Sequence, residues 1–333
     1  MSKNSIVISH RKDADGICSA ALVKHMCGAQ IFLSDYADMV ETLAAVGKAD
    51  DYYICDLATN SKTFPGFLEQ ATRLGSYGHV NYIDHHPLSA ESRSKLTNAG
   101  VEIINSADEC ASVLVYKEYE SKLKDSPQMK IAATCGAITD YMDSGPFAKK
   151  IISSFDRQFL LYEATLLSFT ISMTGRGLEE SNARLVQIAN EIAGGKLPHE
   201  IENAPQLAQT HAEKSARLIQ VAREKGKKMN NFAYISTQES ATGNVAYFLI
   251  GSFDVPVGLA YREEGSDYYE ISLRSVEESR HDLGKIASKV AAQLNASGGG
   301  HQHASGARIK RNQLESFLSL LDQELARATV PTQ

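Results

Sequence analysis

Acidic and imidazole side chains recur in four polar segments, each at the end of an apolar stretch of the sequence. The segments are SHRKDADG (9–16), ICDLATN (54–60), IDHHP (83–87) and GAITDYMDSG (136–145). Together they supply these candidate site residues: His10, Asp13, Asp15, Asp56, Asp84, His85, His86 and Asp140. Carboxylate and imidazole groups bind first-row divalent metals, so the set predicts a metal site.

The number of carboxylates suits two cations. Two divalent ions carry four positive charges, which four carboxylates would neutralise, and one aspartate would have to bridge the ions at ~3.5–4 Å. A water shared by such ions becomes a hydroxide near neutral pH, and the ions stabilise negative charge on a phosphate. Without metal, so many carboxylates in one crevice would repel one another and take up protons. We therefore expect two-metal hydrolysis of phosphate esters, with Mn²⁺ the foremost cation and Mg²⁺ or Co²⁺ as alternatives.

Short apolar runs and helical patterns must position these residues. Strands are predicted at 5–10, 31–36, 51–57, 81–86 and 100–105, and helices at 19–26, 111–124 and 130–139. This alternation is typical of an α/β fold with a doubly wound, mostly parallel sheet. Ligands bind such sheets at the carboxyl ends of the strands. We therefore expect His10, Asp56 and the 84–86 triplet to meet at one sheet edge.

The rest of the chain predicts a helical connection and a second, smaller α/β domain. Residues 147–229 have helical apolar spacing and end in a long amphipathic helix at about 205–229. From residue 230 the pattern alternates as in strands, and PVGLAYRE and YYEISLRS flank GSD, a hairpin turn signal. We predict a metal-binding domain at 1–185, a helical linker at 186–229 and a C-terminal domain at 230–333.

Composition and charge disfavour a long nucleic acid as ligand. Among 333 residues, Asp and Glu outnumber Lys and Arg by 40 to 34, whereas proteins that grip many phosphates have strong basic patches. The chain shows no apolar run long enough for a membrane helix and no signal peptide. Five scattered cysteines without a CxxC pair favour free thiols, so we expect a cytoplasmic protein. A homodimer is left open.

The C-terminal domain carries a candidate phosphate-binding set. Gly298, Gly299 and Gly300 would let backbone N–H groups approach an anion closely, and His301 could add a hydrogen bond. Arg274, at the end of a hairpin strand, could pair with a terminal phosphate through its guanidinium fork. A flexible loop is the alternative for three glycines alone, but the flanking SLRS and HQHASG favour binding.

The four polar segments resemble those of the DHH phosphoesterase family. The end of the chain resembles the family's DHH-associated substrate domain, through YEISLRS (269–275) and GGGHQHASG (298–306). Nano-RNases, cyclic-dinucleotide phosphodiesterases and RecJ-type exonucleases share this layout. In the family the second domain closes over the substrate, so the resemblance implies a substrate-binding role for residues 230–333.

The resemblance also implies a role for each candidate. His10 and Asp13 would bind one metal, and Asp15, His85 and Asp140 the other. Asp56 would bridge the two metals. His86 would approach the substrate phosphate as a catalytic residue, and Asp84 would orient its neighbouring histidines.

The chain departs from the family pattern at two places. Two residues separate His10 from Asp13, where many members have three. Members commonly place a glycine soon after the last ligand, whereas here Tyr141, Met142 and Asp143 intervene. We interpret Asp143 as a cap of the next helix in preference to a carboxylate that supports the metals.

The leading hypothesis for function is hydrolysis of phosphodiester bonds in dinucleotides or short oligonucleotides, of the nano-RNase type. Nucleoside bisphosphate phosphatase activity would accompany it. The alternatives are a RecJ-like single-strand exonuclease and a cyclic-dinucleotide phosphodiesterase. A RecJ-like enzyme needs a basic channel with stacking aromatics, and the chain has no tryptophan and a net charge of −6. A non-catalytic scaffold would be expected to lose its ligands, and GGGH argues against a pyrophosphatase. We expect a short nucleotide partner and no stable complex with a long nucleic acid.

Overall fold

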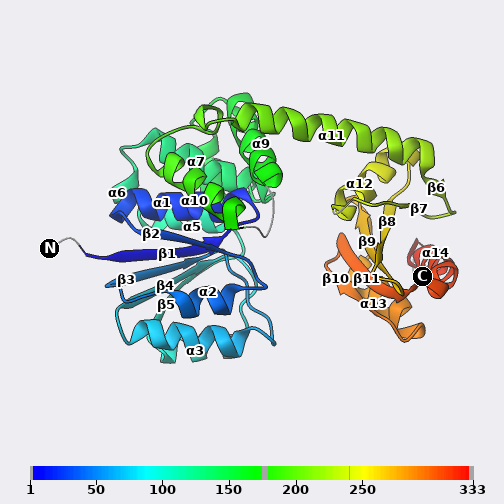
Figure 1. The fold of residues 1–333 in the computed structure, drawn as a ribbon, viewed down its shortest axis with the longest axis horizontal. Helices are drawn as coiled ribbons and strands as arrows, with labels where there is room; N and C mark the ends of the chain where they lie inside the picture. Colours follow the sequence, from blue (N-terminus) through cyan, green and yellow to red (C-terminus); the bar gives the residue numbers. More distant parts are fainter. Residues whose placement is uncertain (1–2, 175–178, 240, 330–333) are drawn as a thin grey trace. The chain divides into compact units, whose positions relative to one another are not determined.

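A computed structural model describes residues 3–174, 179–239 and 241–329 of the chain (Figure 1). It divides into two compact units, Met1–Ala212 and Glu213–Gln333, and α11 (Ala204–Lys225) crosses the boundary. The finer division with a linker at 186–229 stays a prediction. Within the described ranges, no helix combines the length and the apolar character that a bilayer span requires.

The first unit contains a fully parallel five-stranded sheet, as predicted. Its strands are β1 (Ser5–His10), β2 (Gln30–Ser34), β3 (Asp51–Cys55), β4 (His79–Asp84) and β5 (Val101–Asn105). Their order is β2-β1-β3-β4-β5, so the winding direction reverses between β1 and β3. In open α/β sheets the ligand crevice lies at that reversal, beyond the carboxyl ends of the strands. The fold thus places the ends of β1 and β3 on the two sides of a binding position.

Helices cover both faces of this sheet because each strand is apolar on both sides. Val7 of β1 packs into one core and Ile6 and Ile8 pack into the other, since successive strand side chains alternate. One face carries α1 (Ala14–Cys27), α5 (Ala111–Glu118), α7 (Pro127–Thr139), α9 (Arg157–Thr174) and α10 (Glu179–Ala193). The other face carries α2 (Met39–Ala45), α3 (Phe64–Gly75) and α4 (Ala90–Asn98). The remaining short helices are α6 (Glu120–Leu123), α8 (Pro146–Ile152) and η1 (Pro198–Glu200).

The second unit is built on a mixed six-stranded sheet of order β10-β11-β9-β8-β7-β6. The strands are β6 (Lys227–Lys228), β7 (Ala233–Ser236), β8 (Val257–Glu264), β9 (Tyr268–Ser275), β10 (Ser297–Gly300) and β11 (Ala304–Lys310). β8 and β9 form the predicted antiparallel hairpin, with Gly265 at a φ of 60° in its turn. α12 (Thr242–Phe253) connects the parallel strands β7 and β8, and the sequence analysis did not predict it.

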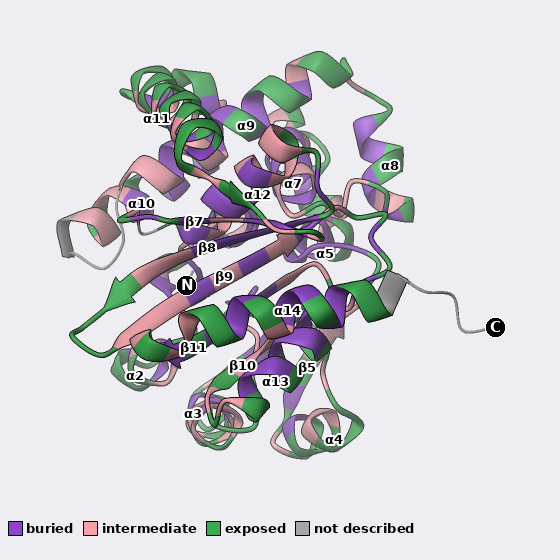
Figure 2. Ribbon diagram, turned by 90° about the vertical axis from the view of Figure 1, so that its right-hand side faces the viewer, coloured by how far each residue is buried: buried purple, intermediate pink, exposed green. Residues whose placement is uncertain are grey.

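Two small cores hold the second unit together. α13 (Leu283–Gln293) and α14 (Leu314–Thr329), preceded by η2 (Arg311–Gln313), cover one face of the sheet. α12 and the end of α11 cover β7 and β8 on the other face, with Val245 and Leu249 packed against Ala260. Exposed and buried residues alternate around α13 and α14 (Figure 2), as in helices that lie on a sheet.

The bounds of one predicted helix were wrong, and one strand was not predicted. The predicted helix 111–124 ends at Glu118, and Tyr119 separates it from the short α6. The three glycines, for which a flexible loop was the disfavoured alternative, belong to β10, the edge strand paired with β11. Gly299 and Gly300 have φ angles of 154° and 140°. The strand can be recognised only from its pairing with β11. Glycines have no side chains, so the sequence shows no alternation of apolar and polar residues that would predict it.

Candidate metal centre

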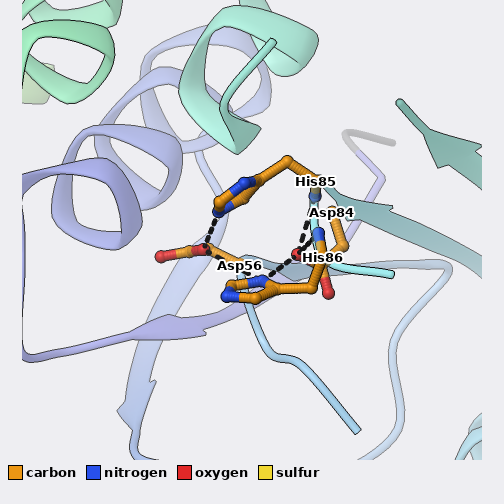
Figure 3. Close-up of side chains that lie close together, drawn as sticks. All are labelled: Asp56, Asp84, His85 and His86. Atoms are coloured by element: carbon orange, nitrogen blue, oxygen red, sulfur yellow. Dashed lines mark hydrogen bonds and ion pairs between the residues drawn. The ribbon is translucent and has the colours of Figure 1, made fainter. Parts of the chain in front are cut away.

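The ends of β1, β3 and β4 bring the predicted ligands together around Asp56. The Oδ2 atom of Asp56 lies 3.6 Å from His10 Nδ1, and its Oδ1 atom lies 3.3 Å from His85 Nε2. Asp13 Oδ2 lies 2.9 Å from the same nitrogen of His10. Figure 3 shows His85 and His86 converging on Asp56. Each of the two carboxylate oxygens of Asp56 thus faces a histidine that could bind a metal.

A helix end completes the cluster on the side of His85. Asp140, directly after α7, places Oδ2 3.2 Å from His85 Nε2, and Asp15 Oδ2 lies 4.0 Å from that nitrogen. The structure therefore forms two groups whose ligand atoms lie within 4.8 Å of one another: His10, Asp13 and Asp56, and Asp15, His85 and Asp140. A further group joins Asp56 to the 84–86 triplet. All six predicted metal ligands lie in one place, in the two sets that the resemblance implies.

Two helix N-termini fix the paired aspartates of the first segment. Asp13 is the N-cap of α1 and accepts a hydrogen bond from Gly16 N at 3.0 Å, which leaves its second oxygen for the cluster. Asp15 accepts hydrogen bonds from the first amides of α5, Ala111 N and Ser112 N, both at 2.8 Å. Asp13 is therefore a helix cap and a member of the cluster at once.

Asp84 is fully buried and holds the histidine pair. Its Oδ1 accepts hydrogen bonds from the backbone of His85 at 2.7 Å and from His86 Nδ1 at 2.8 Å (Figure 3). Tyr82 donates its hydroxyl to the other oxygen at 2.5 Å. Burial opposes ionisation, but these hydrogen bonds keep the pKa of Asp84 below its usual value. Because Nδ1 of His86 is bonded to Asp84, the other ring nitrogen, Nε2, points away from Asp84.

The electrostatics of the cluster fit cations. Burial, with the charges of Asp13 and Asp15, raises the pKa of Asp56 well above its usual value. Burial and Asp15 also raise the pKa of Asp140 to about 7. The buried atoms Asp56 Oδ2 and Asp140 Oδ2 have no hydrogen-bond partner among the described residues. Carboxylates so crowded and so poorly solvated form a favourable site for divalent ions.

The same carboxylates also change the pKa of His10, the histidine at the end of β1. Burial alone would lower the pKa of His10, but the nearby carboxylates of Asp13 and Asp56 outweigh burial and raise that pKa to about 10. In the chain without metal, a protonated His10 therefore balances part of the acidic charge. A bound cation would take that place.

The sequence analysis missed the contribution of β2. The ring of Tyr36 stacks on His10 at 4.5 Å between centroids, and its hydroxyl lies 3.4 Å from His86 Nε2. Asp35 Oδ1 lies 3.6 Å from His10 Nε2, and Lys12 forms an ion pair with Asp35. The signal was present, because Asp35 and Tyr36 end another strand at the same sheet edge.

Asp143 does not cap the next helix, contrary to the interpretation above. The N-cap of α8 is Gly145, which has no side chain that could accept a hydrogen bond. Asp143 instead forms an ion pair with Arg157 at 3.1 Å. The acidic residue that serves α8 is Glu109, which accepts hydrogen bonds from Phe147 N and Ala148 N.

In the second unit, Arg274 presents a half-buried guanidinium. Its Nη1 donates to Leu273 O at 2.8 Å, its Cζ lies 5.8 Å from the Tyr247 ring centre, and none of the described carboxylates forms an ion pair with it. A Cβ on Gly243 would come within 2.4 Å of Arg274 Nη2, so the glycine makes room for this side chain. Burial lowers the pKa of Arg274.

β11 separates the glycine strand β10 from β9, which carries Arg274. The guanidinium of Arg274 meets α12, whereas Gly298 and Gly300 pack against α13. Ala304 of β11 is the register partner of Arg274, and Gly300 pairs with Ser305. Gly299 and Gly300 line a surface hollow of about 650 Å³ together with Lys285. His301 is exposed and forms a backbone hydrogen bond with Ala304 O at 2.8 Å.

Comparison with known families agrees with this organisation. Residues 4–140 match the model of the DHH family N-terminal domain, and residues 229–327 match the model of the DHHA1 domain. The chain belongs to the DHH family. The cluster around Asp56 lies in the DHH domain, with Asp140 at its last matched residue, and Arg274 lies in the DHHA1 domain.

One curated relative of this DHH protein is an uncharacterized protein of Methanocaldococcus jannaschii. It is 33% identical over 99 residues, which are 29% of this chain and 22% of the relative. The matched segment thus spans less than a quarter of that protein's length.

Solved structures share the fold at low identity. The DHH domain of a protein described as a member of a ribosomal protein family has a TM-score of 0.72 at 15% identity, over 97% of this chain and 87% of that one. A pGpG-specific phosphodiesterase, PggH of Vibrio cholerae, has a TM-score of 0.62 at 15% identity, over 98% and 100%. RecJ of Thermus thermophilus in complex with Mn²⁺ has 0.61 at 15%, over 99% and 53%.

Proposed function

We propose that this protein is a metal-dependent phosphoesterase that hydrolyses phosphodiester bonds in dinucleotides or very short oligonucleotides. The observation that carries the proposal is the convergence on Asp56 of ligand-type side chains from three strand ends and one helix end. Such a set, beyond the carboxyl edge of a doubly wound sheet, has the composition of a two-metal hydrolytic site.

Two cations are the proposed cofactors, with Mn²⁺ preferred. His10, Asp13 and Asp56 would hold one, and Asp15, His85 and Asp140 the other, with Asp56 shared. Mixed imidazole and carboxylate donors suit Mn²⁺, and a protein of the same fold is described in complex with it. When bound, the cations supply Lewis acidity toward a phosphate oxygen and a hydroxide at neutral pH.

The chain's own groups orient the substrate around that centre. Burial would lower the pKa of His86, but the hydrogen bond that Nδ1 donates to Asp84 raises it. We propose that the protonated ring directs its Nε2–H to a phosphate oxygen of the substrate. The ring of Tyr36 stacks on His10, and its hydroxyl lies within hydrogen-bond distance of His86 Nε2. Tyr36 therefore helps to hold the imidazole rings of both histidines in position.

A short substrate is supported by the charge of the chain and by Arg274. Acidic residues exceed basic ones, and the guanidinium of Arg274, which has no carboxylate partner among the described residues, suits a single terminal phosphate. We propose Arg274, the glycine strand 298–300 and His301 as the groups that bind this phosphate. Another protein of this fold is described as specific for pGpG, a linear dinucleotide.

A reducing cytoplasmic location remains part of the proposal. It is supported by five free cysteines, four of which are buried, and burial raises the pKa of Cys18, Cys55 and Cys110. Such thiols are poor nucleophiles and unsuited to disulfides.

A hydrolysis panel with purified protein and Mn²⁺ tests the function. The substrates are a linear dinucleotide, a cyclic dinucleotide, a nucleoside 3′,5′-bisphosphate and a single-stranded oligonucleotide of about twenty residues. We expect the highest kcat/KM on the linear dinucleotide. Equal or faster turnover of the long strand would support a RecJ-like exonuclease, and preference for the cyclic compound would support the cyclic-dinucleotide phosphodiesterase. Absence of hydrolysis from all four would refute the proposal.

A further inference from the structure

The helix that delivers Asp140 ends in a backbone turn that favours glycine. Met142 N donates to Ala137 O at 2.8 Å and Tyr141 N donates to Ile138 O at 3.4 Å, which is the hydrogen-bond pattern of a Schellman motif. The residue after the C-cap Asp140 is Tyr141, and its φ is 58°. A bulky side chain in the left-handed region is strained. The chain therefore keeps a tyrosine where glycine would be more stable.

Nothing in the described part of the chain offsets that strain. The side chain of Tyr141 is 91% exposed, the highest value among the exposed large hydrophobic residues. Two other exposed tyrosines have partners: Lys48 lies over the ring of Tyr77 at 5.0 Å, and Arg274 lies over Tyr247. For Tyr141 the described residues provide no ring contact, ion pair or side-chain hydrogen bond. The fold alone gives this residue no stabilising role.

Its position links it to the metal centre. Tyr141 directly follows Asp140, whose Oδ2 lies 3.2 Å from His85 Nε2. Consecutive Cα atoms are about 3.8 Å apart, so the backbone of Tyr141 lies next to that of a residue of the cluster. Strained backbone next to a functional group is a recurrent feature of binding sites.

We propose that Tyr141 stacks on a nucleobase of the substrate whose phosphodiester lies at the metal centre. The inference rests on the proposed function and names the substrate group that this residue recognises. An exposed, flat aromatic face suits a nucleobase of any identity, because every base has a π-face. A stacked base contributes about 1–3 kcal/mol, which corresponds to about 5- to 150-fold in affinity.

Steady-state kinetics on a matched pair of substrates test the inference. The pair is a linear dinucleotide and its analogue without bases, and the variants are Tyr141→Ala and Tyr141→Phe. We expect Tyr141→Ala to raise KM for the dinucleotide at least fivefold and to leave KM for the base-free analogue unchanged. Tyr141→Phe should keep the wild-type KM, since the stack needs the ring and not the hydroxyl. The control is Tyr162→Ala, on an exposed tyrosine of α9, which should change neither KM.

Stability separates stacking from a structural role. Tyr141→Gly removes the strain, so we expect its thermal midpoint to rise by a few degrees while KM for the dinucleotide rises as in Tyr141→Ala. Binding of Mn²⁺ should be the same in wild type and variants. Equal KM in wild type and Tyr141→Ala would overturn the inference. So would a Tyr141→Ala variant that loses affinity for Mn²⁺ or affects both substrates equally.

A direct binding readout keeps this test independent of activity. The chain contains no tryptophan, so Tyr141→Trp introduces a single indole fluorophore beside the cluster. We expect a non-hydrolysable dinucleotide to quench its fluorescence and the base-free analogue to leave it unchanged. If no substrate is hydrolysed but quenching occurs, the phosphoesterase proposal fails and base stacking stands. If hydrolysis occurs without quenching, stacking fails and the phosphoesterase proposal stands.

Discussion

Asp56 concentrates the chemistry of the site in one residue. It is 2% exposed, adopts a φ of 55°, and meets His10 on one oxygen and His85 on the other. Its raised pKa means that the folded chain without metal holds this charge at a cost. The Asp56 carboxylate is therefore suited to bind cations, and in the metal-free protein its negative charge lowers the free energy of unfolding.

The first prediction concerns the substitution Asp56→Asn. An acid whose pKa is raised on folding destabilises the fold at pH values above its ordinary pKa of about 3.9, so removing its charge relieves that cost at pH 7. We expect the variant to lose phosphodiesterase activity but to unfold in EDTA at a temperature equal to or above that of the wild type. Asp143→Asn, which removes an exposed partner of Arg157, is the control and should keep its activity. A metal-free Asp56→Asn protein that is clearly less stable would contradict this account.

Arg274 gives a second prediction at this scale. A charge-assisted hydrogen bond contributes about 1.5–3 kcal/mol. Because Arg274→Ala removes such a bond to the phosphate, we expect the variant to raise KM for a dinucleotide about 10- to 150-fold and to leave the affinity for Mn²⁺ unchanged. Arg274→Lys should recover only part of the affinity, because an ammonium lacks the planar fork. The control is Arg262→Ala on the neighbouring strand, where Arg262 already pairs with Glu270 at 2.6 Å. If the Arg274 and Arg262 variants behave alike, the phosphate clamp is misplaced.

At the scale of elements, close packing of α7 against α5 holds Asp15 in the cluster. Gly136 of α7 lies where a Cβ would come within 2.1 Å of Ser112 Oγ and 2.7 Å of Asp15 Oδ1. We predict that Gly136→Ala destabilises the protein by about 1–3 kcal/mol, as overpacking does, and weakens Mn²⁺ binding by displacing Asp15. Urea unfolding and calorimetric titration with Mn²⁺ measure the two effects.

The matched control is a helical glycine with open space around it. A Cβ on Gly251 of α12 meets no atom within 4 Å, so Gly251→Ala should stabilise by about 0.5–1 kcal/mol and leave Mn²⁺ binding unchanged. Similar behaviour of the two alanine variants would show that the contact between α7 and Asp15 is unimportant.

The sequence predicted the five strands of the first sheet and, through their ends, the residues of the candidate site, whereas α2, α3 and α4 were not predicted. Polar residues at the ends of apolar runs could be assigned to one sheet edge because parallel strands share their carboxyl ends. The same logic was not applied to Asp35 and Tyr36, although they follow β2. The role of Asp15 as acceptor for the α5 amides depends on contacts 96 and 97 residues apart, which no local pattern shows.

The second unit was less predictable for physical reasons. The glycine strand 298–300 has no alternation of apolar and polar side chains, so only its pairing with β11 identifies it. The sequence of α12 is apolar on most sides and contains two glycines, which obscures a helical period. Asp143 illustrates the same limit in the first unit, because its partner Arg157 lies on another helix.

At the scale of the whole molecule, the cluster belongs to one compact unit and Arg274 to the other. A metal that binds only the folded first unit should therefore stabilise that unit alone, by about 2.7 kcal/mol at a concentration 100 times its Kd. We predict that Mn²⁺ raises the unfolding temperature of residues 1–212 relative to EDTA and leaves the second unit unchanged. Hydrogen exchange followed by peptide mass assigns the change to a unit. Equal protection of both units, or of the second alone, would be inconsistent with the proposed site.

The most direct measurement of the central claim is anomalous diffraction from crystals of the protein grown with Mn²⁺. We expect two manganese peaks, one on each side of the Asp56 carboxylate, the first beside His10 and Asp13 and the second beside His85 and Asp140. Crystals that contain Mn²⁺ but show no peak at Asp56, or show Asp15 and Asp140 turned away from it, would contradict the two-metal account.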